Sequence, residues 1–222
     1  GISEVVWYEN PHISGSVDVV RGYHLVAEKF PVNEISVADV NGDGWLYVVN
    51  ASAGSSKQLS WWENLDGTGE NWAERTICNN IDYGKTVDVE DMDGDGDLDV
   101  IAAGAYDLYW FENNDGLGTS WTSHQLPGVF IGCETLLSAD ILGSNRPEIL
   151  AHYILPKRFV LWERTDEAGL TWRMHVLEHS YWYEGLAVGD LDEDETLDVV
   201  AFESGSRIFW FRLGYPSTGT LT

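Results

Sequence analysis

Basic residues are scarce in this sequence. Its 222 residues contain 12 Lys and Arg against 37 Asp and Glu, which gives a formal net charge of −25. So negative a surface repels phosphate groups everywhere, and this argues against nucleic acid and anionic membranes as partners. Cations, cationic proteins and neutral ligands remain compatible with the charge.

Cysteines and long apolar runs are also scarce. Cys78 and Cys133 lie in no CxxC or other metal-spaced motif, so a disulfide between them and two free thiols both stay open. No apolar run reaches the roughly 18 residues of a membrane-spanning helix, so we expect no membrane insertion. No charged-then-apolar leader opens the sequence, and we expect any signal peptide to lie outside this stretch.

Aromatic residues, in contrast, are plentiful, with 11 Trp, 10 Tyr and 7 Phe. They favour strands over helices, and no segment shows a sustained helical period. A hydrophobic fraction of 44% is high enough for a folded core. The composition therefore predicts an all-β globular protein.

Two motifs repeat along the chain in step with each other. Acidic stretches begin at Asp39, Asp91, Asp140 and Asp190, and read DVNGDGWLY, DMDGDGDLD, DILGSNRPE and DLDEDETLD. Strand-like stretches alternate with them, the first before Asp39 and the last after the fourth loop, and read VVWYEN, LSWWEN, LYWFEN, FVLWER and IFWFRL. Both recur at intervals close to 50 residues, which is typical of a repeat protein. We place the repeats at 1–34 (partial), 35–85, 86–134, 135–185 and 186–222.

Each repeat divides into four short strands, with turn residues such as ENNDGLG between the last two. This predicts an all-β fold, a single β-propeller region over residues 1–222 with four-stranded blades. Five strand motifs accompany four acidic loops, so the blade count does not close. Three arrangements are compatible with this count: a small self-closed ring, part of a larger propeller, or a propeller whose uncovered ends pair with another chain. We favour the last two.

The repeats resemble the FG-GAP and VCBS repeat family. The matching residues are the Asp-x-Asp-x-Asp-Gly loops and the Leu-Asp-Val-Val/Ile strand that follows them. The resemblance implies a calcium-binding β-propeller of a secreted or cell-surface protein. It leaves the function open, because the family includes adhesion receptors, lectins and accessory domains of polysaccharide-active enzymes.

The acidic loops have the composition of calcium sites. Calcium takes six to eight oxygen ligands, and glycines between alternate carboxylates permit the tight turn that brings them together. The expected ligands are Asp39, Asn41, Asp43 and Trp45 in the first loop; Asp91, Asp93, Asp95, Asp97 and Asp99 in the second; and Asp190, Asp192, Asp194, Thr196 and Asp198 in the fourth. Trp45, Asp97 and Thr196 would each contribute a backbone carbonyl, and the others a side chain.

The loops are not equivalent. Tyr47 replaces the last aspartate of the first loop, which predicts a weaker site there. The third loop has lost its middle ligands and gained Arg146, so we expect no calcium in it. A helix-loop-helix calcium site is excluded, because the twelfth position counted from Asp91 is Ala102 rather than Glu.

One aromatic segment stands outside the repeat pattern. The sequence HSYWYEG begins at His179, and exposed aromatic rings beside polar groups suit sugar binding. The predicted ligand-binding residues are His179, Tyr181, Trp182, Tyr183 and Glu184. The alternative is that these aromatic rings fill the gap between two blades.

These observations predict an extracellular, calcium-stabilised binding module that is carbohydrate-binding (lectin-like) or adhesive. One alternative is the propeller portion of a polysaccharide- or sugar-active enzyme, although no GxSxG, HExxH or phosphate-binding glycine loop occurs and no catalytic residue is nominated. Another is a structural subunit joined through open blade edges. The expected partners are a glycan or an extracellular protein, with a homo-oligomer or completion by another chain as further options.

Overall fold

The described part of the chain consists of strands joined by turns and loops, and contains no helix. The computed structural model describes residues 3–8, 22–29, 31–52, 57–128, 131–166, 169–178, 183–203 and 207–213. Within them there is accordingly no helix that could span a membrane. Cys78 and Cys133 are both free thiols, and Cys133 is buried.

The strands form five antiparallel sheets in which neighbours in sequence are neighbours in space. One small sheet, which we call the N-terminal pair, contains β1 (Ser3–Tyr8) and β2 (Tyr23–Lys29). Blade 1 contains β3 (Val32–Ala38), β4 (Tyr47–Ser52), β5 (Leu59–Asn64) and β6 (Trp72–Cys78). Blade 2 contains β7 (Thr86–Glu90), β8 (Asp99–Ala103), β9 (Leu108–Asn113) and β10 (Trp121–Gln125).

Blades 3 and 4 continue the series. Blade 3 contains β11 (Ile131–Ala139), β12 (Glu148–Leu155), β13 (Arg158–Arg164) and β14 (Trp172–Glu178). Blade 4 contains β15 (Tyr183–Gly189), β16 (Asp198–Glu203) and β17 (Arg207–Phe211).

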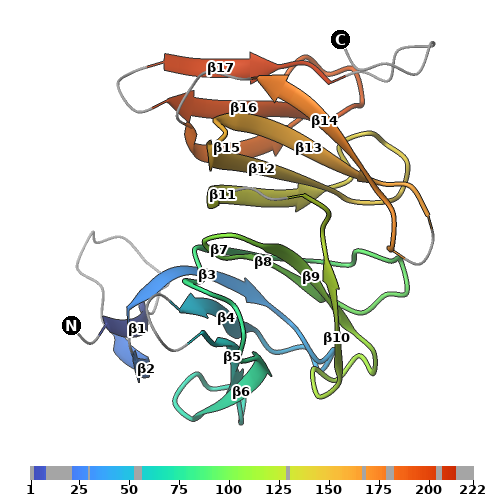
Figure 1. Cartoon of the computed structure of the whole chain (residues 1–222). Helices are drawn as coiled ribbons and strands as arrows, with labels where there is room; N and C mark the ends of the chain where they lie inside the picture. Colours follow the sequence, from blue (N-terminus) through green and yellow to red (C-terminus); the bar gives the residue numbers. More distant parts are fainter. Residues whose placement is uncertain are drawn as a thin grey trace, which may run out of the picture.

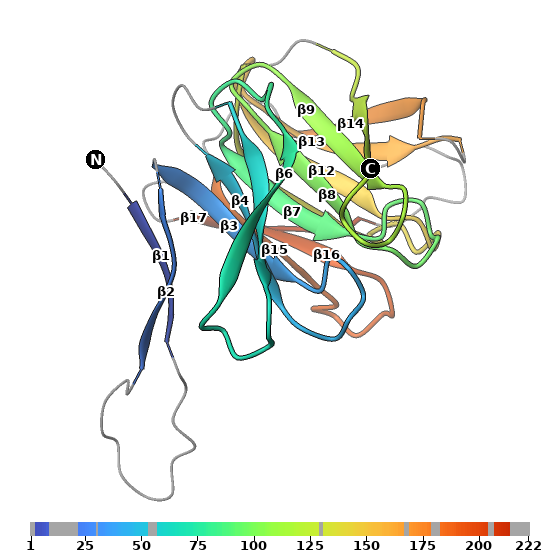
Figure 2. The ribbon, with the colours of Figure 1, turned by 90° about the horizontal axis from the view of Figure 1, so that it is seen from below.

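The four blades are arranged as a β-propeller, which confirms the predicted fold. They follow one another in chain order from the bottom to the top of Figure 1, and the first strands β3, β7, β11 and β15 contact one another in succession. No comparably extensive contact joins β15 back to β3 among the described strands. The N-terminal pair lies beside blade 1, as Figure 2 shows from a second direction.

Blades 2 and 3 bury apolar side chains on both faces, because another blade lies on either side of each. Separate apolar clusters lie between blades 1 and 2, between blades 2 and 3, and between blades 3 and 4. Aromatic neighbours in sequence serve opposite faces. Trp110 packs in the cluster with blade 3, whereas the next residue, Phe111, packs in the cluster with blade 1.

A tryptophan and a glycine recur at these interfaces. A Cβ atom added to Gly69 would lie 2.8 Å from the ring of Trp7, and one added to Gly118 would lie 2.8 Å from the ring of Trp61. Gly69 and Gly118 have φ angles of +76° and +68°, a backbone region that suits glycine. The tryptophan ring of one sheet thus packs directly against a loop of the next sheet.

Candidate calcium centres and the tryptophan pocket

The acidic loops join the first and second strands of each blade. We number them acidic loop 1 (39–47), 2 (91–99), 3 (140–148) and 4 (190–198). In loops 2 and 4 the first aspartate closes the turn, because its carboxylate accepts backbone N–H bonds from further along the loop. Asp91 accepts from Gly94 and Gly96 at 2.8 and 3.1 Å, and Asp190 accepts from Asp194 and Glu195 at 3.0 Å.

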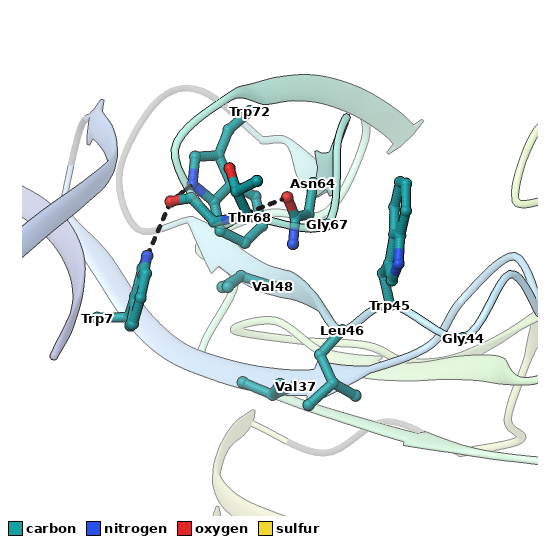
Figure 3. A pocket seen from close by; sticks show the side chains of 11 residues that line it. Trp7, Val37, Gly44, Trp45, Leu46, Val48, Asn64, Gly67, Thr68 and Trp72 are labelled. Carbon is teal, nitrogen blue, oxygen red and sulfur yellow. Dashed lines mark hydrogen bonds between the residues drawn. The ribbon is translucent and has the colours of Figure 1, made fainter. Parts of the chain in front are cut away.

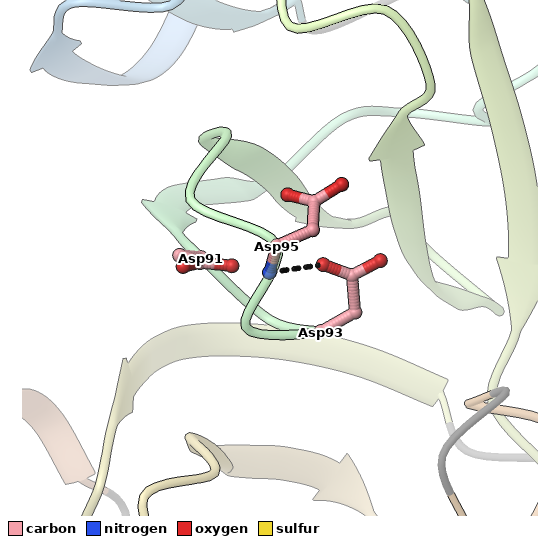
Figure 4. A group of neighbouring side chains, drawn as sticks. All are labelled: Asp91, Asp93 and Asp95. Atoms are coloured by element: carbon pink, nitrogen blue, oxygen red, sulfur yellow. Dashed lines mark hydrogen bonds between the residues drawn. The ribbon is translucent and has the colours of Figure 1, made fainter.

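This turn brings the predicted calcium ligands together in two of the loops. Asp91, Asp93 and Asp95 each offer an oxygen atom within 4.8 Å of the other two, and Figure 4 shows these side chains around the turn of loop 2. The corresponding aspartates of loop 4 form the same group, with members Asp190, Asp192 and Asp194. Carboxylates this close together repel one another. A hard divalent cation, which prefers oxygen ligands, would neutralise that repulsion.

Loop 4 contains two oxygen atoms that fit a cation especially well. Oδ1 of Asp192 and Oδ1 of Asp198 are buried and have no hydrogen-bond partner. A buried carboxylate oxygen without a donor is costly unless a cation coordinates it. The residues present therefore fit calcium, with Asp198 beside the group.

Asp99, the corresponding residue of loop 2, differs in its contacts. It is buried at the base of the loop, where Oδ2 accepts N–H bonds from Met92 and Trp110 and Oδ1 accepts one from Asn113. Burial raises the pKa of Asp99 to about 7. Its role as a calcium ligand stays a prediction, as do those of the carbonyl groups of Asp97, Trp45 and Thr196.

An arginine that the repeat pattern does not reveal lies against loop 4. Nη2 of Arg212 is 2.6 Å from Oδ2 of Asp194 and 3.0 Å from Oδ2 of Asp192. Hydrogen bonds from Thr196 and this guanidinium lower the pKa of Asp194 to about 2. Arg212 thus supplies positive charge to the same carboxylates that a calcium ion would engage.

Loops 1 and 3 are built differently. In loop 1 the Tyr47 hydroxyl donates to Oδ2 of Asp43 at 2.6 Å, and this bond lowers the pKa of Asp43. In loop 3 Asp140 still closes the turn by accepting N–H bonds from Ser144 and Asn145. Glu148 is buried beneath the loop and accepts N–H bonds from Ile141 and Leu142.

The predicted ligand-binding segment lies mostly outside the described residues. His179, Tyr181 and Trp182 are not described, and Tyr183 is described only as the first backbone position of β15. Glu184, the remaining member, is exposed on β15. The role of this segment stays a prediction.

A pocket of about 420 Å³ lies between the N-terminal pair and blade 1. Figure 3 shows Trp7 and Trp72 on one side of it, Trp45 on the other, and Val37 and Val48 beneath. The indole N–H groups of Trp7 and Trp72 both donate to the carbonyl of Gly69, at 2.9 and 2.8 Å, which fixes the two rings. The pocket was not anticipated from the sequence.

The next interface explains why the pocket exists. Between blades 1 and 2 the corresponding space is filled by Val40 and Tyr47, which come from the first two strands of blade 1 and their loop. The Asn113 amide there donates to the carbonyl of Val40 at 3.0 Å. Beside β1 the described residues supply no such pair of strands, so the corresponding face of blade 1 stays open.

Comparisons with known proteins agree with this architecture. A family model described as an FG-GAP-like repeat matches residues 39–102 and 91–151, together about half of the chain. No curated protein matches the chain significantly. Among solved structures, the biofilm matrix protein Bap1 of V. cholerae aligns at 18% identity with a TM-score of 0.50, over 90% of this chain and 28% of its own.

A Tc holotoxin pore structure from Photorhabdus luminescens aligns at 16% identity with a TM-score of 0.48, over 94% of this chain and 10% of its own. The chain therefore spans little more than a quarter of the first structure and a tenth of the second. At these identities the likeness to Bap1 concerns the fold alone.

Proposed function

We propose a function from a premise that the family match establishes: this chain belongs to the FG-GAP-like repeat family. On that basis it acts as an extracellular β-propeller module that calcium stabilises and that binds glycans or an adhesive partner. The observation that carries the proposal is the pair of convergent aspartate groups in loops 2 and 4. Calcium bound there neutralises the repulsion within each loop and links the first two strands of a blade.

Calcium titration of the metal-free protein tests this role. We expect two binding events by calorimetry, and a higher melting temperature in calcium than in chelator. Asp93→Asn should remove one event and leave the other, because Asp93 belongs to loop 2 alone. A protein that melts at the same temperature with and without calcium would refute the structural role.

We propose an extracellular location as well, because many extracellular modules use calcium sites that fill only where free calcium is abundant. A biofilm matrix protein is among the proteins that share this fold, which is compatible with this location.

The tryptophan pocket supports glycans as the ligand class. A pyranose ring stacks its apolar C–H face on an indole, and the pocket presents the rings of Trp7, Trp45 and Trp72. A neutral sugar is also compatible with the net charge of −25, which would repel an anionic partner at long range.

A glycan array in calcium, followed by calorimetry on any sugar found, tests this ligand class. Trp45→Ala should weaken binding by about tenfold, the loss of one stacked ring. The matched control is Trp210→Ala, because Trp210 is similarly exposed but lies on β17, outside the pocket. An array without signal in calcium would contradict glycan binding and leave the calcium result untouched.

A second candidate function, assembly through an open blade face, is favoured by the exposed face of blade 4. Ile208 is 77% exposed and Trp210 is 55% exposed. Their counterparts in the repeat are all buried between blades, namely Leu59, Leu108, Phe159, Trp61, Trp110 and Leu161. In each earlier blade this face is covered by the next blade. The exposed face of blade 4 is therefore suited to packing against another sheet of the same kind.

Light scattering across a range of protein concentrations separates the two candidates. Assembly through blade 4 predicts an oligomer that Trp210→Glu dissociates and that Leu170→Glu, at another exposed apolar position, leaves intact. A monomer at all concentrations would contradict assembly between copies of this chain.

A further inference from the structure

Three arginines gather in blade 3 at repeat positions where blades 1 and 2 have no basic residue. Arg146, Arg164 and Arg173 correspond to Asp97, Asn113 and Thr122 of blade 2 and to Trp45, Asn64 and Ala73 of blade 1. They line one pocket of about 330 Å³ beside acidic loop 3. The chain has only 12 basic residues, so three in one pocket form a distinct cationic site on an otherwise acidic protein.

Arg164 is the buried member of the three. It is 4% exposed, and its Nε and Nη1 atoms are buried without a hydrogen-bond partner. Its guanidinium carbon lies 5.8 Å from the centre of the Trp110 ring, so one face of the group is packed. A buried guanidinium with two nitrogen atoms that lack an acceptor is unfavourable, and this site is therefore suited to an acceptor that the described side chains do not supply.

The same position in blade 2 has no such deficit. The Asn113 amide donates to the carbonyls of Val40 and Leu98, and its oxygen accepts the N–H of Gly118. Replacing this amide by a guanidinium in blade 3 adds positive charge and donors without adding acceptors.

The rest of the pocket is also unlike a calcium loop. Leu142 and Ser144 occupy the places of Asp93 and Asp95, so the carboxylates that gather around a cation in loop 2 are missing. Two acids remain at the pocket. Oε2 of Glu148 accepts two backbone N–H bonds, and Oε2 of Glu163 is shared by His175 at 2.7 Å and Arg173 at 3.2 Å.

We propose that this pocket binds a tetrahedral oxyanion, either a free sulfate or phosphate or the same group carried as an ester on a larger ligand. Arg164 is the buried anchor, and Arg146 and Arg173 contact the anion from the more exposed side. Guanidinium groups recognise such oxyanions through paired N–H bonds. Blade 3 has thus exchanged the cation site of its neighbours for an anion site.

Calorimetric titration of sodium sulfate into the calcium-loaded protein, at constant ionic strength, tests the proposal. We expect saturable binding at one site, which Arg164→Met weakens by about tenfold or more. The matched control is Arg75→Met, because Arg75 pairs with Glu63 in blade 1 as Arg173 pairs with Glu163. Methyl sulfate, titrated in parallel, distinguishes an ester ligand from the free ion by which of the two binds more tightly.

Arg173→Met guards against a folding artefact, because the Arg173 side chain is 59% exposed and its loss should leave the fold intact. It should weaken sulfate binding while circular dichroism stays unchanged. The proposal is overturned if sulfate gives no saturable heat at millimolar concentrations, or if the Arg173 and Arg75 variants bind it equally well.

Discussion

Replacing Glu148 by Gln should stabilise the protein at alkaline pH and not at acidic pH. The Glu148 side chain is 1% exposed at the base of loop 3, and burial raises its pKa from an ordinary value of 4.5 to about 7. The folded state therefore holds a proton that the unfolded state releases. As the pH rises from about 4.5 to about 7, stability is lost, because folding must then bury a carboxylate or keep it protonated.

The size of the effect follows from the shift. One pKa unit corresponds to about 1.4 kcal/mol, so the shift from 4.5 to about 7 amounts to roughly 3 kcal/mol of stability lost at pH 8. At pH 5 most of that stability is still present. Glu148→Gln keeps an oxygen to accept the N–H groups of Ile141 and Leu142 but cannot ionise. The variant should gain roughly 2–3 kcal/mol on the wild type between pH 5 and pH 8.

Urea unfolding followed by tryptophan fluorescence, at pH 5 and pH 8 in saturating calcium, measures this difference. Glu74→Gln, at an exposed position of β6, controls for the loss of one negative charge from a highly acidic protein. The reasoning is refuted if the stability difference between the variant and the wild type is the same at both pH values. It is also refuted if Glu74→Gln reproduces the effect.

Three further outcomes are expected. Asp95→Ala should lower the melting temperature in calcium more than Asp43→Ala, because Asp43 is already engaged by the hydroxyl of Tyr47; equal shifts would contradict this ranking. Gly169→Ala should cost about 2 kcal/mol more than Gly143→Ala in urea unfolding, because both have similar positive φ but only the first would meet the Trp110 ring; equal costs would show that the ring moves freely. Arg212→Gln should tighten calcium binding to loop 4 several-fold by calorimetry, because the ion no longer displaces a guanidinium from Asp194; an unchanged affinity would show no competition.

The features that could be predicted from the sequence are those that depend on its repeat period and on the alternation of residue types. The spacing of the acidic and aromatic motifs gave the propeller, and alternate aspartates gave the groups in loops 2 and 4. Both are local patterns, in which a turn or a strand brings together residues that are close in sequence. Such patterns need no knowledge of how one blade sits on the next.

The contacts that were missed join residues far apart in sequence. Arg212 reaches Asp194 from the position directly after β17, and Trp7 reaches Gly69 across 62 positions. The proposed anion pocket brings together one arginine of loop 3 and one from each of two later strands, and each arginine alone looks like an ordinary surface residue. Arg164 differs from a surface arginine only because it is buried, and no sequence motif indicates that burial.

The repeated seating of a tryptophan on a glycine has a consequence for how such an array evolves. The ring of Trp7 meets the loop of Gly69, that of Trp61 meets Gly118, and that of Trp110 meets Gly169. Blades 1 and 2 thus each carry the ring for the next unit and the glycine for the preceding one. Duplicating or deleting one of these two blades would recreate the same contact at the new junction, so this part of the array can change its length in steps of one blade while the contact is kept.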